Sequence, residues 1–260
     1  MNVTGLGTGP ARVAHLVRHP IKSAGYEPVE AAELTPGAAF PFDRVWAVAH
    51  AAARLTDPLE WAQKLQFLRG WGSAELMAIS CVSDPEARRV TLSHPRQPTT
   101  RFYPDDAADA ARLIDWLRPL WPANRPEPSR VVAVPGQAMT DQDQPLVSIN
   151  SLSSLEALSQ HMGSDLSIHR FRGNIWVEGL APWAELGLVG QDIAIGPVRL
   201  RVEEAIGRCR ATGANPETGV LDADTMGALQ AGFGHTDFGV FARVIAGGIV
   251  SLADEVRPWA

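Results

Sequence analysis

The chain has 260 residues, 45% of them hydrophobic and 20% charged, which is the balance of a globular protein rather than of a disordered segment. Lys and Arg number 23 against 29 Asp and Glu, giving a formal net charge of -6. That charge disfavours non-specific binding to nucleic acid or an anionic membrane but is compatible with a local basic pocket. The two cysteines, Cys81 and Cys209, are too few and too far apart for a disulfide framework, a CxxC site or an iron–sulfur cluster.

The ends of the chain and its apolar stretches indicate where the protein resides. Residues 1–10 are rich in Gly and Thr, with no basic start and no apolar run, so we expect no secretory signal and a cytoplasmic location. The apolar stretch around Val240 to Val250 is interrupted by Arg243 and by glycines before it reaches membrane-spanning length. We therefore expect no membrane partner and no nucleic-acid partner.

The first half predicts short strands separated by Gly and Pro, with two helical segments. The helical spacing covers Leu59 to Leu68 and Asp105 to Leu120, the second ended by Pro119 and Pro122. The predicted strands are Arg12 to Arg18, Val29 to Leu34, Val45 to Ala49, Leu76 to Val82 and Val90 to Ser93. This pattern is typical of a small barrel or sandwich.

Trp121 to Ser129 is rich in proline and polar residues, which predicts a linker and a division into domains 11–125 and 126–260. After it, Ser153 to Met162 predicts a helix with a capping box formed by Ser153 and Glu156, and Thr225 to Gln230 predicts a second short helix. Further strands are predicted at Val131 to Val134, Leu146 to Ile149, Asn174 to Val177, Ile193 to Ile195, Val198 to Glu203 and Phe238 to Val244. The fold class predicted is α+β, mostly β.

Two motifs carry possible chemistry. Cys209 stands between Arg208 and Arg210, and adjacent positive charge favours a thiolate, which is both a nucleophile and a soft metal ligand. The alternative is that Cys209 is a small buried hydrophobe, which spacing alone favours. Alternation places Arg170 and Arg172 on one face of an extended segment, where with Asn174 they form a fork suited to an oxyanion; the alternative is a solvated strand edge.

Five ordered segments together resemble the MOSC family, a domain class named from the C-terminal part of molybdenum-cofactor sulfurase. They are HPIKS at 19–23, FDRVWAV at 42–48, RFRGNIWVEGLAPWAE at 170–185, GRCRATGANPETG at 207–219 and FGVFARVIAGGIVSLADEV at 238–256. The resemblance implies a MOSC N-terminal β-barrel-like region over 11–125, followed by a MOSC β-barrel domain over 126–260 with a few short helices. It places a cofactor in a cleft between the two.

The relatives implied are the amidoxime-reducing component proteins and their bacterial counterparts, which use a pyranopterin molybdenum cofactor to reduce N-hydroxylated compounds. The resemblance makes Cys209 the catalytic residue and the molybdenum ligand. A family association with pyridoxal phosphate binding also comes with it. The implied cofactor-binding residues are Lys22, Ser23, Arg44, Ser153, Arg170, Arg172, Asn174, Arg208 and Phe241, with the register at Ser153 open by one residue to Ser154.

The expected activity is reduction of amidoximes, hydroxylamines and N-oxides, with a small N-hydroxylated substrate and a separate redox protein as electron donor, because the chain ends directly after the matched segments. A monomer is favoured. A second hypothesis makes the protein a sulfur or molybdenum-cofactor carrier that uses the same cysteine, and a third makes it a cofactor-free binding protein. Asn215 replaces the family's usual Asp, so an amide stands where a carboxylate is common near the metal.

Other residues are expected to pack. Cys81 lies in the apolar run Ala78 to Val82 and is expected in the core. The tryptophans at 46, 116 and 176 are expected to be packing residues, whereas Trp183 is a candidate for lining a pocket.

Overall fold

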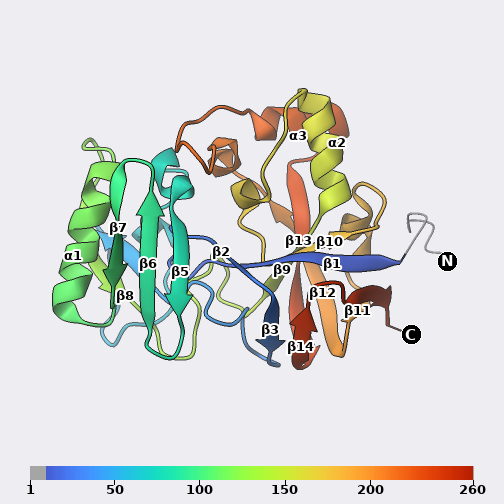
Figure 1. The fold of residues 1–260 in the computed structure, drawn as a ribbon, viewed down its shortest axis with the longest axis horizontal. Coiled ribbons are helices and arrows are strands. Elements are labelled where there is room, and N and C mark those ends of the chain that lie inside the picture. Colours follow the sequence, from blue (N-terminus) through green and yellow to red (C-terminus); the bar gives the residue numbers. More distant parts are fainter. Residues whose placement is uncertain (1–9, 260) are drawn as a thin grey trace.

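A strand from the start of the chain closes a β-barrel whose other strands come from the second half, in a computed structural model that describes residues 10–259 (Figure 1). The strand order is β10, β9, β13, β12, β11, β15 and β1, and β1 pairs back to β10. The bounds are β1 (Ala11–Arg18), β9 (Val147–Ser151), β10 (Ile175–Glu178), β11 (Asp192–Ile195), β12 (Val198–Gly207), β13 (Asp237–Ala246) and β15 (Glu255–Pro258). Among these seven strands, β9 and β10 pair in parallel and the other neighbours pair antiparallel.

Alternation along the strands explains the barrel core. In β12, Val198, Leu200 and Val202 are buried and point inward with the apolar residues of the other strands. Arg199 and Arg201, between them, lie outside and both form ion pairs with Asp192 of β11. Alternate residues of the strand therefore face the barrel core, and the residues between them face the solvent.

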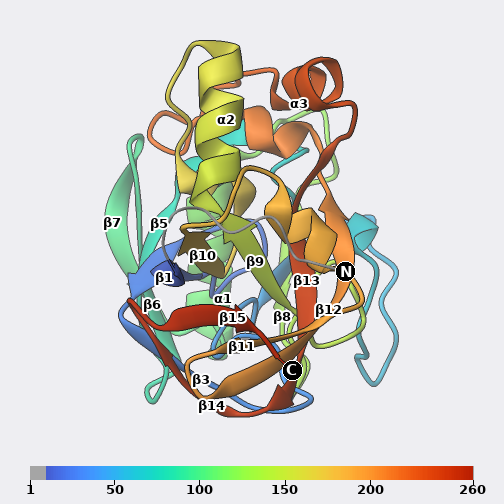
Figure 2. The same cartoon turned by 90° about the vertical axis from the view of Figure 1, so that its right-hand side faces the viewer.

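Two helices cover one end of the barrel (Figure 2). They are α2 (Leu152–Met162) and α3 (Thr225–Phe233), which pack over Phe171, Trp176 and Phe238. The predicted capping box at Ser153 is wrong: the helix begins one residue earlier, and the hydroxyl of Ser151, the last residue of β9, accepts the N–H of Ser154. The cap moves because the chain turns straight from the strand into the helix.

A second module, residues 47–132, lies beside the barrel (Figure 1). It contains the sheet β5 (Ser80–Asp84), β6 (Arg89–His94) and β7 (Gln97–Phe102), the helix α1 (Ala107–Leu117), and the pair β4 (Ala47–His50) with β8 (Pro128–Val132). Its core includes Leu92, Phe102 and Leu113, as well as Cys81, and Trp46 from just before β4 packs into the same core. The expected burial of Cys81 and of the tryptophans at 46, 116 and 176 is confirmed.

The remaining elements are short. β2 (Glu27–Val29) continues the barrel sheet beyond β1, and β3 (Ala31–Leu34) pairs with β14 (Gly248–Ser251). Six 3-10 helices complete the described residues: η1 (Lys64–Gln66), η2 (Ala74–Ala78), η3 (Arg118–Leu120), η4 (Ile168–Phe171), η5 (Ala184–Leu188) and η6 (Arg210–Gly213). None of the helices in residues 10–259 is long and apolar enough to cross a bilayer.

The mostly β, α+β fold class is confirmed, but two predicted elements are wrong. Only Lys64–Gln66 is helical within the predicted helix at 59–68, because Phe67 and Leu68 bond to the backbone of β4 instead. The start of the predicted strand at 76–82 is the 3-10 helix η2. The domain division at 125/126 stays a prediction. The expectation that no secretory signal is present rests mostly on residues 1–9, which lie outside the described residues.

Replacing Leu16 by Ala tests the role of β1 in the barrel. Leu16 is buried and only 1% exposed, so truncation should lower the free energy of unfolding by about 2 to 5 kcal/mol. Leu252→Ala makes the same change at a side chain that is 43% exposed and should cost less than about 0.5 kcal/mol. Urea denaturation followed by tryptophan fluorescence measures both; equal effects would contradict the assignment.

Candidate functional site

A cavity of about 540 Å³ lies where loops of the barrel and of the second module meet. Loops after β1, before β9, after η4 and after β12 contribute to it, as does the stretch from Lys64 to Met77. Its wall combines five cationic side chains predicted from the sequence with one thiol. The predicted site residues that line it are Lys22, Ser23, Arg44, Arg170, Arg172, Asn174, Arg208, Cys209 and Phe241.

Lys22 is the buried amine of the cavity. Its Nζ donates hydrogen bonds to the Met139 carbonyl at 2.9 Å and to Asp141 Oδ1 at 2.5 Å. Burial lowers the pKa of Lys22 to about 8, against the opposing pull of the Asp141 carboxylate. Lys22 is therefore charged at neutral pH and loses its charge in mild alkali.

Arg44 is held by an adjacent buried carboxylate. The Arg44 guanidinium pairs with Asp43, whose Oδ1 also accepts the backbone N–H of His19 at 2.7 Å. Burial by itself raises the pKa of Asp43, but Arg44 and His19 outweigh burial and the pKa is lowered. Asp43 therefore stays ionised and fixes Arg44, which also donates to the Arg172 carbonyl at 3.1 Å.

Arg172 offers a donor that the protein leaves unused. Its Nη2 donates to the carbonyls of Ile21 and Gly25, each at 3.3 Å, whereas its buried Nη1 has no hydrogen-bond partner. Burial and the nearby Arg44 lower the pKa of Arg172. An unpaired buried N–H is costly, so this atom indicates a site for an anion.

The prediction that Arg170 and Arg172 share one face of an extended segment is wrong. Arg170 lies in η4, and Arg172 follows it in the left-handed region with φ of 49°. Arg170 instead contacts the segment that follows Cys209. Its Nη1 donates to the Gly213 carbonyl at 3.2 Å and pairs with Asp222 at 2.8 Å. Both arginines still line the cavity because a tight turn, rather than strand alternation, brings them there.

Cys209 follows β12, immediately before η6, and is exposed. This excludes the alternative of a small buried hydrophobe. Its carbonyl accepts the hydroxyl of Thr212 at 3.0 Å, which fixes the turn after it. The thiol thus lies at the wall of a cavity that also contains Lys22 and Arg172.

Arg208 clamps the cysteine loop. Its Nε and Nη2 donate to the Phe238 carbonyl, its Nη1 donates to the Phe171 carbonyl at 2.8 Å, and its Nη2 also reaches Asn150 Oδ1 at 3.2 Å. The guanidinium carbon lies 5.6 Å and 5.8 Å from the ring centroids of Phe171 and Phe238. Arg208 therefore acts on Cys209 by holding three backbone segments together.

Asn174 and the serines also differ from expectation. The Asn174 amide is used within the protein, because its oxygen accepts the Ser148 hydroxyl at 2.9 Å and its nitrogen donates to the Val17 carbonyl. The structure does not bring Ser153 to the cavity, and Ser154 donates its hydroxyl to the buried Glu185 at 2.8 Å. The serine of this region that lines the cavity is Ser148, on β9 itself.

Two further residues considered in the sequence, Asn215 and Trp183, lie away from this cavity. Asn215 does not line the cavity, and its amide donates to Asp222 at 2.7 Å, so it is part of its own turn. Trp183 does not line the cavity either and packs against Phe233 with a centroid separation of 4.4 Å.

Sequence reasoning missed Asp141 and Asn150. Asp141 lies in a polar loop with no motif and is recognisable only by its contact with Lys22. Asn150 is fully buried in β9, where it follows Ile149 directly, and a polar amide next to a predicted strand was a usable signal. Its side chain fits between two glycines: a Cβ on Gly173 or Gly239 would lie 1.7 Å or 2.0 Å from its amide atoms.

The side chains that line the cavity determine which kind of metal or cofactor it could hold. Residues 10–259 contain no cluster of three or more His, Cys, Asp or Glu side chains able to hold a metal ion. A metal bound at Cys209 must therefore bring most of its ligands with it, as a dithiolene cofactor does. Lys22, Arg44 and the unpaired Arg172 Nη1 suit a phosphate on the same group, so the residues present fit a phosphorylated metal cofactor.

Comparison with protein families matches residues 136–257 to the MOSC domain. This part of the chain is similar to the MOSC domain. Among solved structures, the YuaD protein of Bacillus subtilis is 14% identical over 97% of this chain and 98% of its own, with a TM-score of 0.48. YiiM of Geobacillus stearothermophilus is 15% identical over 44% of this chain and 54% of its own, with a TM-score of 0.35. A search of curated proteins finds no match.

The matched MOSC domain and the segment before it both contribute to the cavity. Arg172, Arg208 and Cys209 fall within the matched residues. Lys22 and Arg44 come from the loops that follow β1 and precede β4, upstream of the match. The cationic part of the wall therefore depends on both segments of the chain.

Replacing Gly173 by Ala tests the packing behind the cavity. The added Cβ would lie 1.7 Å from Asn150 Nδ2, so the variant should lose more than about 2 kcal/mol of unfolding free energy. Gly187→Ala is the matched control, because nothing lies within 4 Å of its added Cβ, and it should change stability by less than about 0.5 kcal/mol. Chemical denaturation of both variants measures this; a neutral Gly173→Ala would refute the close approach.

Sulfate binding tests the anion site. The pKa of Lys22 is about 8, so Lys22 is charged at pH 7 and mostly neutral at pH 9, and sulfate affinity should fall about tenfold between them. Sulfate itself does not titrate in this range. Lys22→Gln should bind sulfate more weakly at pH 7 and show a flatter pH profile in isothermal titration calorimetry. Wild-type affinity that does not change with pH would contradict the role of Lys22.

Proposed function

We propose that this protein binds a pyranopterin molybdenum cofactor in the cavity and reduces N-hydroxylated compounds there, namely amidoximes, hydroxylamines and N-oxides. The observation that carries the proposal is an exposed thiol, Cys209, in the same cavity as Lys22, Arg44 and Arg172. A soft metal ligand and a cationic anion site in one cavity match a group that is a metal complex at one end and a phosphate at the other.

The residues have distinct parts in holding this group. Lys22, Arg44 and the free Nη1 of Arg172 would offset the phosphate charge, and Cys209 would bind the metal. Arg208 would position Cys209 through its bonds to the Phe171 and Phe238 carbonyls. When bound, the cofactor supplies a redox-active metal that exchanges two electrons with the substrate.

The reaction balances simply. An N-hydroxylated substrate takes up two electrons and two protons, its N–O bond breaks, and the oxygen leaves as water. The chain's contribution is to orient the substrate and limit water: Leu65, Met77 and Phe241 supply apolar wall beside the polar cations. A small, largely apolar substrate with one polar N–OH group suits this lining.

Pyridoxal phosphate suits the cavity less well. Its usual attachment is a Schiff base with a lysine amine. The buried amine of the cavity, Lys22, is already bound by the Met139 carbonyl and by Asp141.

A second candidate function is transport of sulfur or of the cofactor to another protein. The exposure of Cys209 favours it, because a carrier must present its sulfur to a partner. In that case Cys209 would hold a persulfide and the protein would not turn over an N-hydroxylated substrate.

Cys209→Ser tests the proposal. Protein produced in a host that makes the cofactor should contain about one molybdenum per chain by mass spectrometry and should reduce benzamidoxime with reduced methyl viologen. Cys209→Ser should lose at least about 90% of the activity, because an alcohol does not replace a soft thiolate. Cys81→Ala, at the buried cysteine, is the control and should keep both metal and activity.

Two outcomes would count against the reductase. A Cys209→Ser variant with full activity would show that the thiol has no role at the metal. A persulfide mass shift on Cys209 in wild-type protein that does not reduce benzamidoxime would favour the carrier instead.

A further inference from the structure

An exposed tryptophan at the rim of the cavity is surrounded by arginines. Trp71 lies between η1 and η2 of the second module and is 41% exposed. The guanidinium carbons of Arg125, Arg69 and Arg210 lie 5.0 Å, 5.6 Å and 5.9 Å from its ring. Three cations therefore gather on one exposed aromatic side chain, an arrangement we call the Trp71 surface.

The cations of the Trp71 surface are not neutralised within the described residues. None of the three arginines forms an ion pair or a side-chain hydrogen bond with residues 10–259. Among the other arginines of residues 10–259, Arg243 is paired with Glu203 whereas the exposed Arg101 and Arg130 have no ion pair, so the distinguishing feature of the Trp71 surface is that three such cations share one ring. In a chain whose net charge is -6, this is a local concentration of unpaired positive charge.

The Trp71 surface begins inside the cavity and continues outside it. Arg69 and Trp71 line the cavity together with Cys209, whereas Arg125 and Arg210 do not. Arg210 directly follows Cys209 and is exposed. A small substrate would contact the groups that face the cavity, so the outward cations indicate an occupant larger than a substrate.

We propose that the Trp71 surface is the docking site for a small acidic electron-carrier protein. The proposal rests on the proposed reductase function, which consumes two electrons per substrate and so oxidises two one-electron carriers in turn. Trp and Arg are enriched where proteins bind each other, and a positive patch on an acidic protein orients an acidic partner, since the rest of the surface repels it. The partner's redox group would thereby approach the cavity rim beside Cys209.

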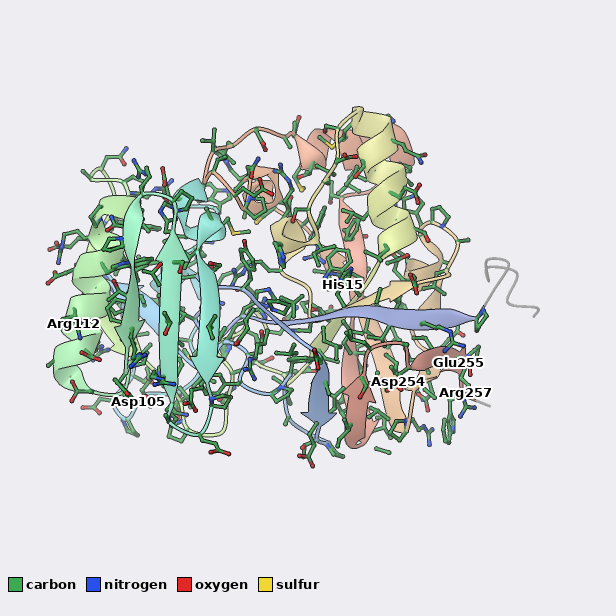
Figure 3. All side chains as sticks on the ribbon, viewed as in Figure 1. His15, Asp105, Arg112, Asp254, Glu255 and Arg257 are labelled. Carbon is green, nitrogen blue, oxygen red and sulfur yellow. The ribbon has the colours of Figure 1, made fainter. Side chains whose placement is uncertain are left out.

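Charge reversal at the outward arginines tests the surface by direct binding. The probe is an oxidised, acidic plant-type [2Fe–2S] ferredoxin, titrated calorimetrically into the cofactor-loaded protein at low salt. Arg125→Glu and Arg210→Glu should each weaken binding about tenfold and reduce its salt dependence. The matched control is Arg257→Glu: Arg257 also lies over an exposed tryptophan, Trp259, at 6.0 Å, but at the end of the barrel away from the second module (Figure 3). It should bind like wild type.

Turnover separates this proposal from the reductase function. With reduced ferredoxin as donor, Arg125→Glu should lose most of the rate of benzamidoxime reduction, whereas with reduced methyl viologen it should match wild type. If wild-type protein did not reduce benzamidoxime with reduced methyl viologen, the proposed reductase function would be wrong, whereas the docking proposal would still be decided by the binding measurement. Wild-type protein that fails to bind ferredoxin, variants that bind it unchanged, or arginine-dependent binding of a single-stranded oligonucleotide in its place would each overturn the docking proposal.

Discussion

The guanidinium of Arg208 holds together the segments that make the site. It reaches the Phe171 carbonyl at the end of η4, the Phe238 carbonyl at the start of β13 and the Asn150 side chain on β9. Because removing these hydrogen bonds would leave a partly buried guanidinium unsatisfied, separating the three segments is energetically unfavourable. Cys209 is the next residue, so its position is fixed by contacts of Arg208 with η4, β13 and β9, which are distant from one another in the sequence.

The other cations divide between those the protein uses and those it leaves available. Arg170 pairs with Asp222 and Arg44 with Asp43, so both are oriented in advance, and the electrostatic cost of burying them is already offset. Arg172 instead keeps one buried nitrogen without a partner. Lys22 is held only by a carbonyl and by Asp141, whose own side chain is 53% exposed. The donors with most capacity left for an anion are therefore those of Lys22 and Arg172, and Arg44 adds an oriented positive charge beside them.

Much of the fold was predictable because the barrel strands alternate apolar and polar residues; Val198 to Val202 is the clearest case. The segment from Leu59 to Leu68 was not, since its leucines follow helical spacing while its end bonds to β4. For the site, short motifs brought nine residues to the cavity, but not their geometry: Arg170 and Arg172 meet through a left-handed turn that alternation does not describe. Asp141 was unpredictable, because only a contact over more than a hundred residues gives it a role.

The place of β1 in the sheet ties the two ends of the chain to each other. It lies between β10 and β15, both from the last third of the sequence, and its continuation is the loop that contains Lys22. A fragment of residues 126–260 would lack β1 and would expose the unpaired edges of β10 and β15. Unpaired sheet edges promote association with other chains. The strand that closes the barrel is thus also the strand that leads into the loop with the cavity's lysine, so a change in its register would be expected to displace that amine.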